Sequence, residues 1–176
     1  MNQYIALLRG INVGGRNLKM AEIKACLEQN GYQNVITVLQ TGNIILDSPL
    51  KVPDLKTALE TLLQKQFGYP AQLLICRPGQ MSAIISRFPF ETGEHEHRYI
   101  IFMESGRPEE MIAGAPAVDK PVETVQAAEE VVYWRVQKGL TLDSPFGKYM
   151  NKMTGKYLLT TRNVNTLEKI LKKCRL

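Results

Sequence analysis

The stretch that decides the fold class is Tyr4-Ile5-Ala6-Leu7-Leu8, together with the loop and the helix pattern that follow it. An uninterrupted apolar run of this length predicts a buried β-strand. After a loop containing Gly10, apolar residues recur three or four positions apart from Met20 to Leu27, which predicts an amphipathic helix that ends near Asn30-Gly31. The chain therefore begins with a strand and a helix.

The same kinds of pattern continue after this helix. Residues 35–39 and 43–46 are typical of two strands joined around Gln40-Thr41-Gly42, where glycine permits the positive φ of a tight turn. Pro53 opens a second amphipathic helix, and residues 71–76 form a further strand. The order βαββαβ predicts a ferredoxin-like subdomain, in which two helices pack on one face of a four-stranded antiparallel sheet.

A looser version of this order occupies the rest of the chain. The expected strands are 98–103, 122–126, 131–136 and 156–160, and the expected helices are 108–113, 146–153 and 164–174. We therefore expect an α+β fold of two ferredoxin-like subdomains with antiparallel sheets, the second degenerate and with an appended C-terminal helix. The expected ranges are 1–77 for the first subdomain, 78–97 for a linking helix and polar loop, and 98–176 for the second subdomain.

The composition is that of a folded protein with one domain or two small ones. The 176 residues are 44% apolar and 22% charged, which allows a real core and argues against a disordered chain. Neither a membrane span nor a signal peptide is apparent. Cys26, Cys76 and Cys174 form neither a disulfide framework nor a zinc motif. We expect a cytoplasmic protein with no membrane partner, and the oligomeric state stays open.

Positive charge is concentrated in the last part of the chain. The net charge is +5, but residues 91–130 carry three basic against ten acidic residues, and residues 131–176 carry ten against two. Clustered positive charge attracts anions, so a phosphate, a nucleotide or a nucleic acid is a suitable partner. A solvated surface that keeps the protein soluble is the alternative.

The first candidate for ligand binding is the loop Arg9-Gly10-Ile11-Asn12-Val13-Gly14-Gly15-Arg16-Asn17. Its glycines let the backbone approach a ligand, the helix N-terminus that follows favours negative charge, and two arginines flank the loop. The spacing matches neither the dinucleotide-binding fingerprint nor a P-loop. A tight turn with Asn17 as a helix cap is the alternative. The candidate ligand-binding residues of this loop are Arg9, Gly10, Asn12, Gly14, Gly15 and Arg16.

Two further segments are candidates for the same ligand. The turn Thr161-Arg162-Asn163 precedes the last helix and offers hydroxyl, guanidinium and amide groups to an anion. Asn165 and Glu168 have the spacing of a capping box, so Asn165 is interpreted as the cap of that helix. Thr41 and Asn43 lie at the hairpin tip, where an ordinary turn is the alternative.

Three of these segments carry a resemblance. The run Leu7-Leu8-Arg9-Gly10-Ile11-Asn12-Val13-Gly14-Gly15, the segment Thr41-Gly42-Asn43 and the run Thr161-Arg162-Asn163 with Thr166 occur in this order. They resemble the successive signatures of an uncharacterised bacterial family, catalogued as a domain of unknown function. The resemblance covers essentially the whole chain. It implies a cytoplasmic α+β protein of two ferredoxin-like subdomains, but no established activity, cofactor or catalytic residue. Family members often carry an aromatic residue where this chain has Val164.

Few residues suit catalysis or metal binding. The chain offers no recognisable Ser-His-Asp order and no closely paired carboxylates. His95 and His97 alternate with Glu94 and Glu96, but a four-ligand metal site lacks further partners, and an exposed acidic loop is the alternative. No metal, cofactor or nucleophile is proposed, and whether the chain is an enzyme stays open.

One strand carries a pattern found in RNA-binding sheets. Tyr133 and Arg135 are expected on one face of the strand 131–136, with Trp134 on the other face as a core residue. Exposed aromatic and basic side chains on such a sheet stack and hold bases. The strands of the first half lack exposed aromatic residues, and no aromatic-rich RNA-binding motif is present.

The leading hypothesis is a protein that binds a small anionic ligand, phosphate- or nucleotide-like, between the loop 9–17 and the turn 161–163. If it is an enzyme, Arg9, Arg16 and Arg162 act as electrostatic clamps. The alternative is a nucleic-acid-binding module, for RNA, that uses the basic C-terminal region. A third hypothesis is an interaction protein that docks a partner.

Overall fold

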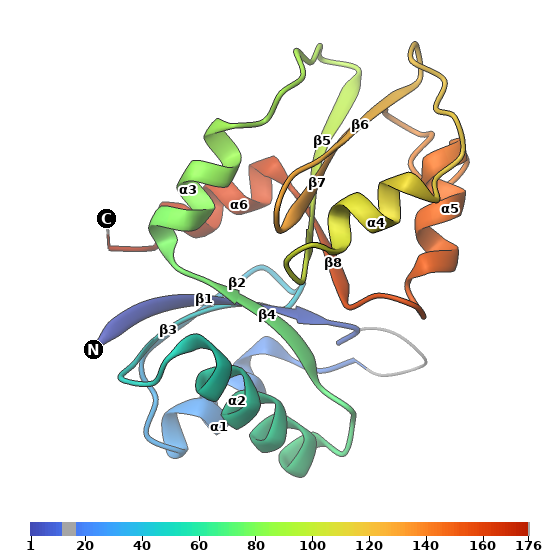
Figure 1. Ribbon diagram of the computed structural model, residues 1–176. Coiled ribbons are helices and arrows are strands. Elements are labelled where there is room, and N and C mark those ends of the chain that lie inside the picture. The colour runs from blue at the N-terminus through green and yellow to red at the C-terminus, as the bar shows by residue number, and fades with distance from the viewer. Residues whose placement is uncertain (12–16, 176) are drawn as a thin grey trace. The chain divides into compact units, whose positions relative to one another are not determined.

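The computed structural model describes residues 1–11 and 17–175 (Figure 1). By their internal contacts these residues form two compact units, one made of the described residues up to Ile84 and from Glu168 onward, the other of Ile85–Leu167. The strands form two four-stranded antiparallel sheets, and the elements follow the order βαββαβ twice. The expected α+β fold of two ferredoxin-like subdomains is confirmed.

The first unit contains one sheet and two helices that cover one of its faces. The strands are β1 (Asn2–Arg9), β2 (Gln33–Val38), β3 (Asn43–Ser48) and β4 (Gln72–Cys76), in the spatial order β2-β3-β1-β4. Helices α1 (Met20–Gln29) and α2 (Val52–Phe67) lie together on the same side of this sheet (Figure 1). Every pair of neighbouring strands is antiparallel.

The core of the first unit lies between this sheet and its helices. Alternation along β1 turns Tyr4, Ala6 and Leu8 toward the helices, where all three are buried. The helices bury their apolar stripes against these side chains, with Ile23 from α1 and Leu59 from α2. The periodicity read from the sequence therefore describes the packing of this unit correctly.

The second unit repeats the arrangement. Its strands are β5 (Glu96–Met103), β6 (Glu123–Ala127), β7 (Val131–Gln137) and β8 (Leu159–Asn163), in the order β6-β7-β5-β8. Helices α4 (Arg107–Ala113) and α5 (Pro145–Met153) supply Met111 and Phe146 to its core. Trp134 is 2% exposed, with its ring centroid 5.4 Å from that of Phe146. Trp134 is thus a core residue, as expected.

Two of the described helices are not part of the βαββαβ repeats. Each of them contains a boundary between the two units, after residue 84 in one and after residue 167 in the other. They are α3 (Pro78–Ser86) and α6 (Val164–Leu171). After α6, the backbone N–H of Arg175 donates to Gln3 Oε1 over 2.7 Å, and its guanidinium pairs with Asp47. Both partners lie on the sheet face opposite α1 and α2. Residues 168–175 therefore group with the first unit, whereas the expected range of the second subdomain was 98–176.

The helices are all short. The longest among the described residues, α2, has 16 residues. Across residues 1–11 and 17–175, every helix falls short of the length and apolar character needed to cross a membrane.

Candidate functional site

Two segments predicted to bind ligand meet at one corner of the first unit, where β1 ends. The turn between β2 and β3 returns against β1, and the backbone N–H of Leu8 donates to the carbonyl oxygen of Gly42 over 2.7 Å. Gly42 has a φ of 77°, and a Cβ placed on it would lie 2.9 Å from Leu8 Cβ. A residue with a side chain would push the turn away from β1, so the close packing of the turn against the strand requires glycine at position 42.

Arg9, the last residue of β1, stands at this corner. Its Nη1 donates to Oε1 of Gln72 on β4 over 3.1 Å. The next residue, Gly10, takes a φ of 69° and turns the chain out of the strand, after which Ile11 packs back into the core. A partly exposed guanidinium beside a turned backbone is suited to hold an anion.

Part of the predicted loop lies outside the described residues. Those ligand candidates are Asn12, Gly14, Gly15 and Arg16. Where the description resumes, the backbone N–H of Leu18 donates to the carbonyl of Ile11 over 3.3 Å. Helix α1 then has Lys19 at its N-cap, without a side-chain capping bond, so the alternative role of Asn17 as a cap does not hold.

Asn43 closes the hairpin turn with its side chain. It is fully buried, and its Nδ2 donates to the carbonyl of Val38 over 2.9 Å and to Thr41 Oγ1 over 2.8 Å. These bonds tie the start of β3 to the end of β2. The Asn43 amide therefore serves the turn, and Thr41 is the exposed residue of the pair.

The segment 161–163 lies in a strand and not in a turn, because β8 extends to Asn163. Alternation turns Arg162 to one face of the sheet and Thr161 and Asn163 to the other, so the three side chains do not converge on one ligand. This corrects the expected cradle of three neighbouring donors. Arg162 is the charged member of the segment.

Arg162 is a buried cation. It is 8% exposed, and its Nη1 donates to Thr160 Oγ1 over 2.6 Å and to the carbonyl of Thr161 over 3.0 Å. Burial lowers the pKa of Arg162 to about 10, so the guanidinium still carries its charge at neutral pH. A charge in a region of low dielectric acts on its surroundings more strongly than one in water.

Asn163 caps α6. Its Oδ1 accepts a hydrogen bond from the backbone N–H of Asn165 over 2.9 Å, which is the bond an N-cap side chain makes with the first turn of a helix. The capping role predicted for Asn165 is wrong, because the helix already begins at Val164. Strand β8 and helix α6 thus follow each other without a loop.

Tyr133 and Arg135 do not present an exposed face for stacking. Tyr133 is 3% exposed and meets the Phe88 ring edge to face at 5.6 Å. Arg135 donates from Nε to Thr124 Oγ1 over 2.8 Å and pairs with Glu96. Alternation places the two side chains on one face as predicted, but the chain itself covers that face.

The two histidines lie at the start of β5, His97 within the strand and His95 just before it. Throughout the described part of the chain, no three His, Cys, Asp or Glu side chains are grouped closely enough to hold a metal ion. The His97 ring lies 5.4 Å from that of Tyr99. A polar hollow of about 410 Å³ is lined by Gly93, Glu94, His95, Glu96, Gln137 and Lys138.

The cysteines are free thiols. Cys26 and Cys76 are buried, and Cys174 is half-buried. Burial raises the pKa of the Cys26 thiol, and it raises the pKa of the Cys174 thiol to about 11. Both therefore stay protonated at neutral pH, which disfavours a nucleophilic role.

Glu123 is a buried acid that the sequence analysis missed. It is 0% exposed, its Oε2 accepts from Trp134 Nε1 over 3.0 Å, and its Oε1 accepts from the backbone N–H of Phe146 over 2.7 Å. One carboxyl group thus joins β6, β7 and the start of α5. The available signal was the lone buried tryptophan, because a buried indole N–H requires an acceptor.

The fold places this chain in the class of α+β proteins with two ferredoxin-like units. In this chain the segments predicted to bind a ligand carry the basic residues Arg9 and Arg162. Within this class the family is known from sequence. Residues 1–133 match the family model described as "Protein of unknown function (DUF1697)", and the chain belongs to this family. The matched range contains the loop 9–17 and the hairpin turn, and it ends before the segment 161–163.

The comparison with curated proteins gave no match. Among solved structures, the chain is similar to the conserved bacterial protein SP0830 from Streptococcus pneumoniae, with 22% sequence identity, a TM-score of 0.78 and 97% of each chain covered. At this level of identity the likeness shows the fold alone.

Proposed function

We propose that this chain binds a small anionic ligand, phosphate- or nucleotide-like, with the loop that follows β1, and that Arg162 is a further candidate anion-binding residue in the second unit. The observation that carries the proposal is the corner of the first unit where the turn at Gly42 packs against Leu8, and where Arg9 stands beside Gly10. Two segments separated in the sequence, each a candidate by composition, contribute to this one corner.

Arg9 supplies the charge at this corner. A guanidinium binds phosphate and carboxylate oxygens through charge-assisted hydrogen bonds that can be bidentate. The hydrogen bond to the Gln72 side chain orients the Arg9 guanidinium at this corner. Gly10 turns the backbone at the same place, and a glycine has no side chain to keep a ligand from the main chain.

Arg162 supplies a cation in the second unit. Its Nη1 donates to a hydroxyl and to a carbonyl group, and these bonds orient the guanidinium. If the chain is an enzyme, Arg9, Arg16 and Arg162 stabilise negative charge as electrostatic clamps. No nucleophile and no general acid or base is proposed.

A thermal-shift titration of the purified chain tests the proposal. The probes are inorganic phosphate, adenosine monophosphate and adenosine triphosphate. A ligand at 100 times its dissociation constant adds about 2.7 kcal/mol to the free energy of unfolding, which shifts the melting temperature by several degrees. The Arg9→Ala variant should lose this shift. Arg77→Ala is the matched control, because it removes the same charge from an exposed position of the same unit.

The outcomes separate the proposal from its alternatives. A shift lost in Arg9→Ala and kept in Arg77→Ala supports a site at the end of β1. No shift with any probe, or an equal loss in both variants, overturns it. Arg162→Lys, which keeps the charge but removes the guanidinium fork, tests the second unit. If Arg9→Ala and Arg162→Lys weaken binding of the same probe, both segments act on one ligand, as the sequence suggested.

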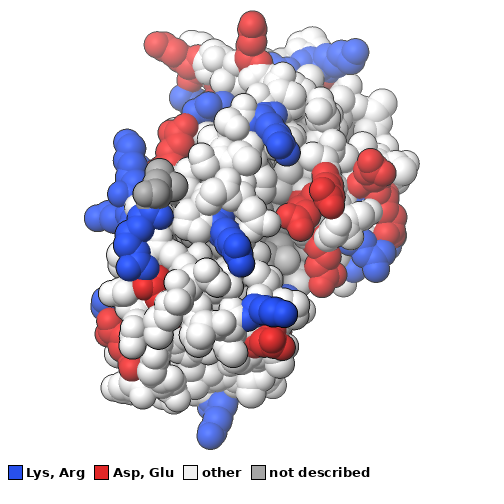
Figure 2. Space-filling view, turned by 60° about the vertical axis from the view of Figure 1, so that its left-hand side comes forward, with Lys and Arg blue, Asp and Glu red and all other residues white. Residues whose placement is uncertain are grey.

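A second candidate function is the binding of a nucleic acid. The observation that favours it is the basic end of the chain, where Lys169, Lys172 and Lys173 are all exposed. Figure 2 shows several Lys and Arg side chains gathered next to one another on the face in view. Closely spaced cations displace counterions from phosphates, so affinity falls steeply with salt.

The test of this candidate is the salt dependence of binding to a short RNA. The logarithm of affinity is plotted against the logarithm of salt concentration, and each phosphate contact removed should reduce the slope by about 1. We expect this reduction in Lys172→Ala and in Lys173→Ala. The control is Lys51→Ala, an exposed lysine outside the basic C-terminal region. Affinity that does not change with salt rejects this candidate.

A further inference from the structure

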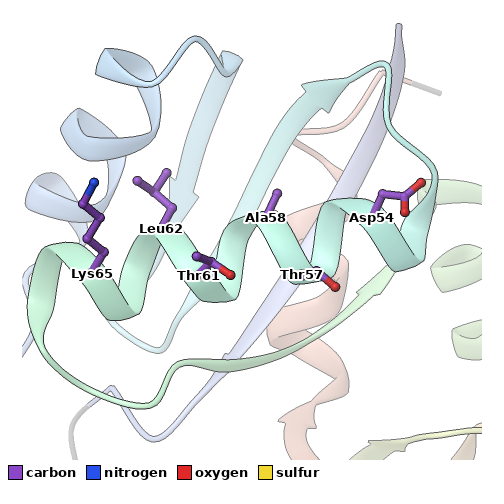
Figure 3. A pocket seen from close by; sticks show the side chains of 6 residues that line it. All are labelled: Asp54, Thr57, Ala58, Thr61, Leu62 and Lys65. Atoms are coloured by element: carbon purple, nitrogen blue, oxygen red, sulfur yellow. The ribbon is translucent and has the colours of Figure 1, made fainter.

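Helix α2 carries a shallow hollow along its outer side. The hollow has a volume of about 490 Å³, and α2 alone lines it. Figure 3 shows the lining side chains spaced along the length of the helix. They are Asp54, Thr57, Ala58, Thr61, Leu62 and Lys65. Opposite charges stand at the two ends, and small or apolar side chains lie between them.

The spacing of four of these residues places them in one row. With 3.6 residues per turn, positions 54, 58, 61 and 65 fall within a narrow stripe of the helix surface. The row begins with a carboxylate in the first turn of the helix and ends with an ammonium group in the last turn. Between these ends, Ala58 and Thr61 are small enough to let a second helix come close.

This row is complementary to itself when a second copy is placed antiparallel. About a two-fold axis midway along the row, Asp54 faces Lys65 of the second copy. The remaining lining residues also pair with one another, Thr57 with Leu62 and Ala58 with Thr61. All six residues are thus used, and both ends of the contact bring opposite charges together. A two-fold interface requires this kind of self-complementarity.

We propose that α2 is the docking surface for the α2 of a second copy of this chain, packed antiparallel with Asp54 opposite Lys65 at both ends. The charges at the ends of the row are available for such pairing. Within the described parts of the chain, neither Asp54 nor Lys65 forms an ion pair, whereas Lys56 and Glu60 elsewhere on α2 pair with each other. The charge pattern and not the apolar area selects the partner.

The contact is weak by its size. A helix of 16 residues is about 24 Å long, and one face of it buries less than the roughly 800 Å² per partner of a stable interface. The dimer is therefore expected to dissociate in the micromolar range or above and to weaken with salt. Sedimentation velocity over protein concentrations from about 10 μM to about 1 mM covers that range.

Charge reversal tests the pairing directly. Asp54→Lys places like charges at both ends of the contact, and so does Lys65→Asp. Each variant alone should weaken the dimer by about tenfold or more, because two attractions become two repulsions. An equal mixture of the two variants should form a mixed dimer, since one chain then presents only lysines and the other only aspartates. The double variant Asp54→Lys/Lys65→Asp should dimerise by itself like the wild type.

Two control variants match these changes away from α2. Glu22→Lys on α1 and Lys148→Asp on α5 reverse charges at exposed positions, and both should leave the dimer unchanged. A wild type that stays monomeric at every concentration overturns the proposal. A dimer that tolerates Asp54→Lys, one that the controls weaken equally, or single variants that fail to recover on mixing also overturn it.

Discussion

The carboxyl group of Glu123 holds the second unit together, and its removal should destabilise that unit strongly. In Glu123→Ala, the indole N–H of Trp134 and the backbone N–H of Phe146 lose their acceptor while both residues remain buried. Each orphaned buried donor costs about 1–3 kcal/mol, and the deleted atoms leave a cavity. We expect the free energy of unfolding to fall by about 3–5 kcal/mol in total.

Glu123→Gln is the more conservative change. The glutamine keeps the shape and one acceptor oxygen, but it turns an NH₂ group toward the second donor. One hydrogen bond is therefore kept and one is lost, and we expect a loss of about 1–3 kcal/mol. The two variants together distinguish the effect of the hydrogen bonds from that of the cavity.

Urea denaturation followed by tryptophan fluorescence is the assay. Trp134 is the one tryptophan of the chain and is itself a partner of Glu123, so its emission reports on the unit under test. The control is Glu109→Ala on the exposed side of α4, which should change the free energy of unfolding by less than about 0.5 kcal/mol. A Glu123→Ala variant as stable as this control would refute the reasoning. If Glu123→Ala does not fold, the loss measured for Glu123→Gln decides.

Three further predictions concern the first unit. Gly42→Ala should lower the free energy of unfolding by about 2–3 kcal/mol, measured by thermal denaturation, because a φ of 77° is strained for alanine and the added Cβ would lie 2.9 Å from Leu8 Cβ. Gly31→Ala is the control: its φ is 87° but the space around it is open, so the free energy of unfolding should fall by only about 1 kcal/mol. Leu39→Asn should stabilise the chain by about 0.5–1 kcal/mol, because Leu39 is 47% exposed at a φ of 58° that asparagine tolerates better. Burial raises the pKa of Asp47, but hydrogen bonds to it, including that of the Arg175 guanidinium, outweigh burial and lower it overall. Its contribution to stability is therefore complete above the pKa of an unfolded aspartate, about 3.9, and is lost as the pH falls below that value, so the stability difference between wild type and Asp47→Asn should shrink in acid.

The elements of the fold were readable from the sequence because each follows a local rule. In β1, α1 and α2, the apolar side chains whose spacing predicted burial are buried in the core. Gly42 was correctly placed in a tight turn between two strands. The second repeat was readable in the same way, although β8 extends to Asn163 and not to residue 160 as expected.

The candidate residues were harder to assign, because the same residue types serve structure and binding. Asn43 was predicted as a ligand residue, and its amide closes the turn. Asn163 was predicted to contact an anion, and its side chain caps α6. Arg135 was expected on an open sheet face, and its guanidinium pairs with Glu96. In each case a hydrogen-bond partner distant from the motif, or a shift of the element boundary, decided the role.

The sequence by itself determined the α+β class, the twofold βαββαβ order and the core positions, because these depend on residue periodicity and on the conformational preferences of glycine and proline. Only the tertiary structure decided which polar groups are buried and with which partners. Strand alternation predicts which face of the sheet Glu123 and Arg162 point to. It does not predict whether other parts of the chain cover that face. The partners of Asp47 and Arg175 are 128 positions apart in the chain. Such contacts depend on how the sheets and helices are folded over one another, and no local pattern carries that information.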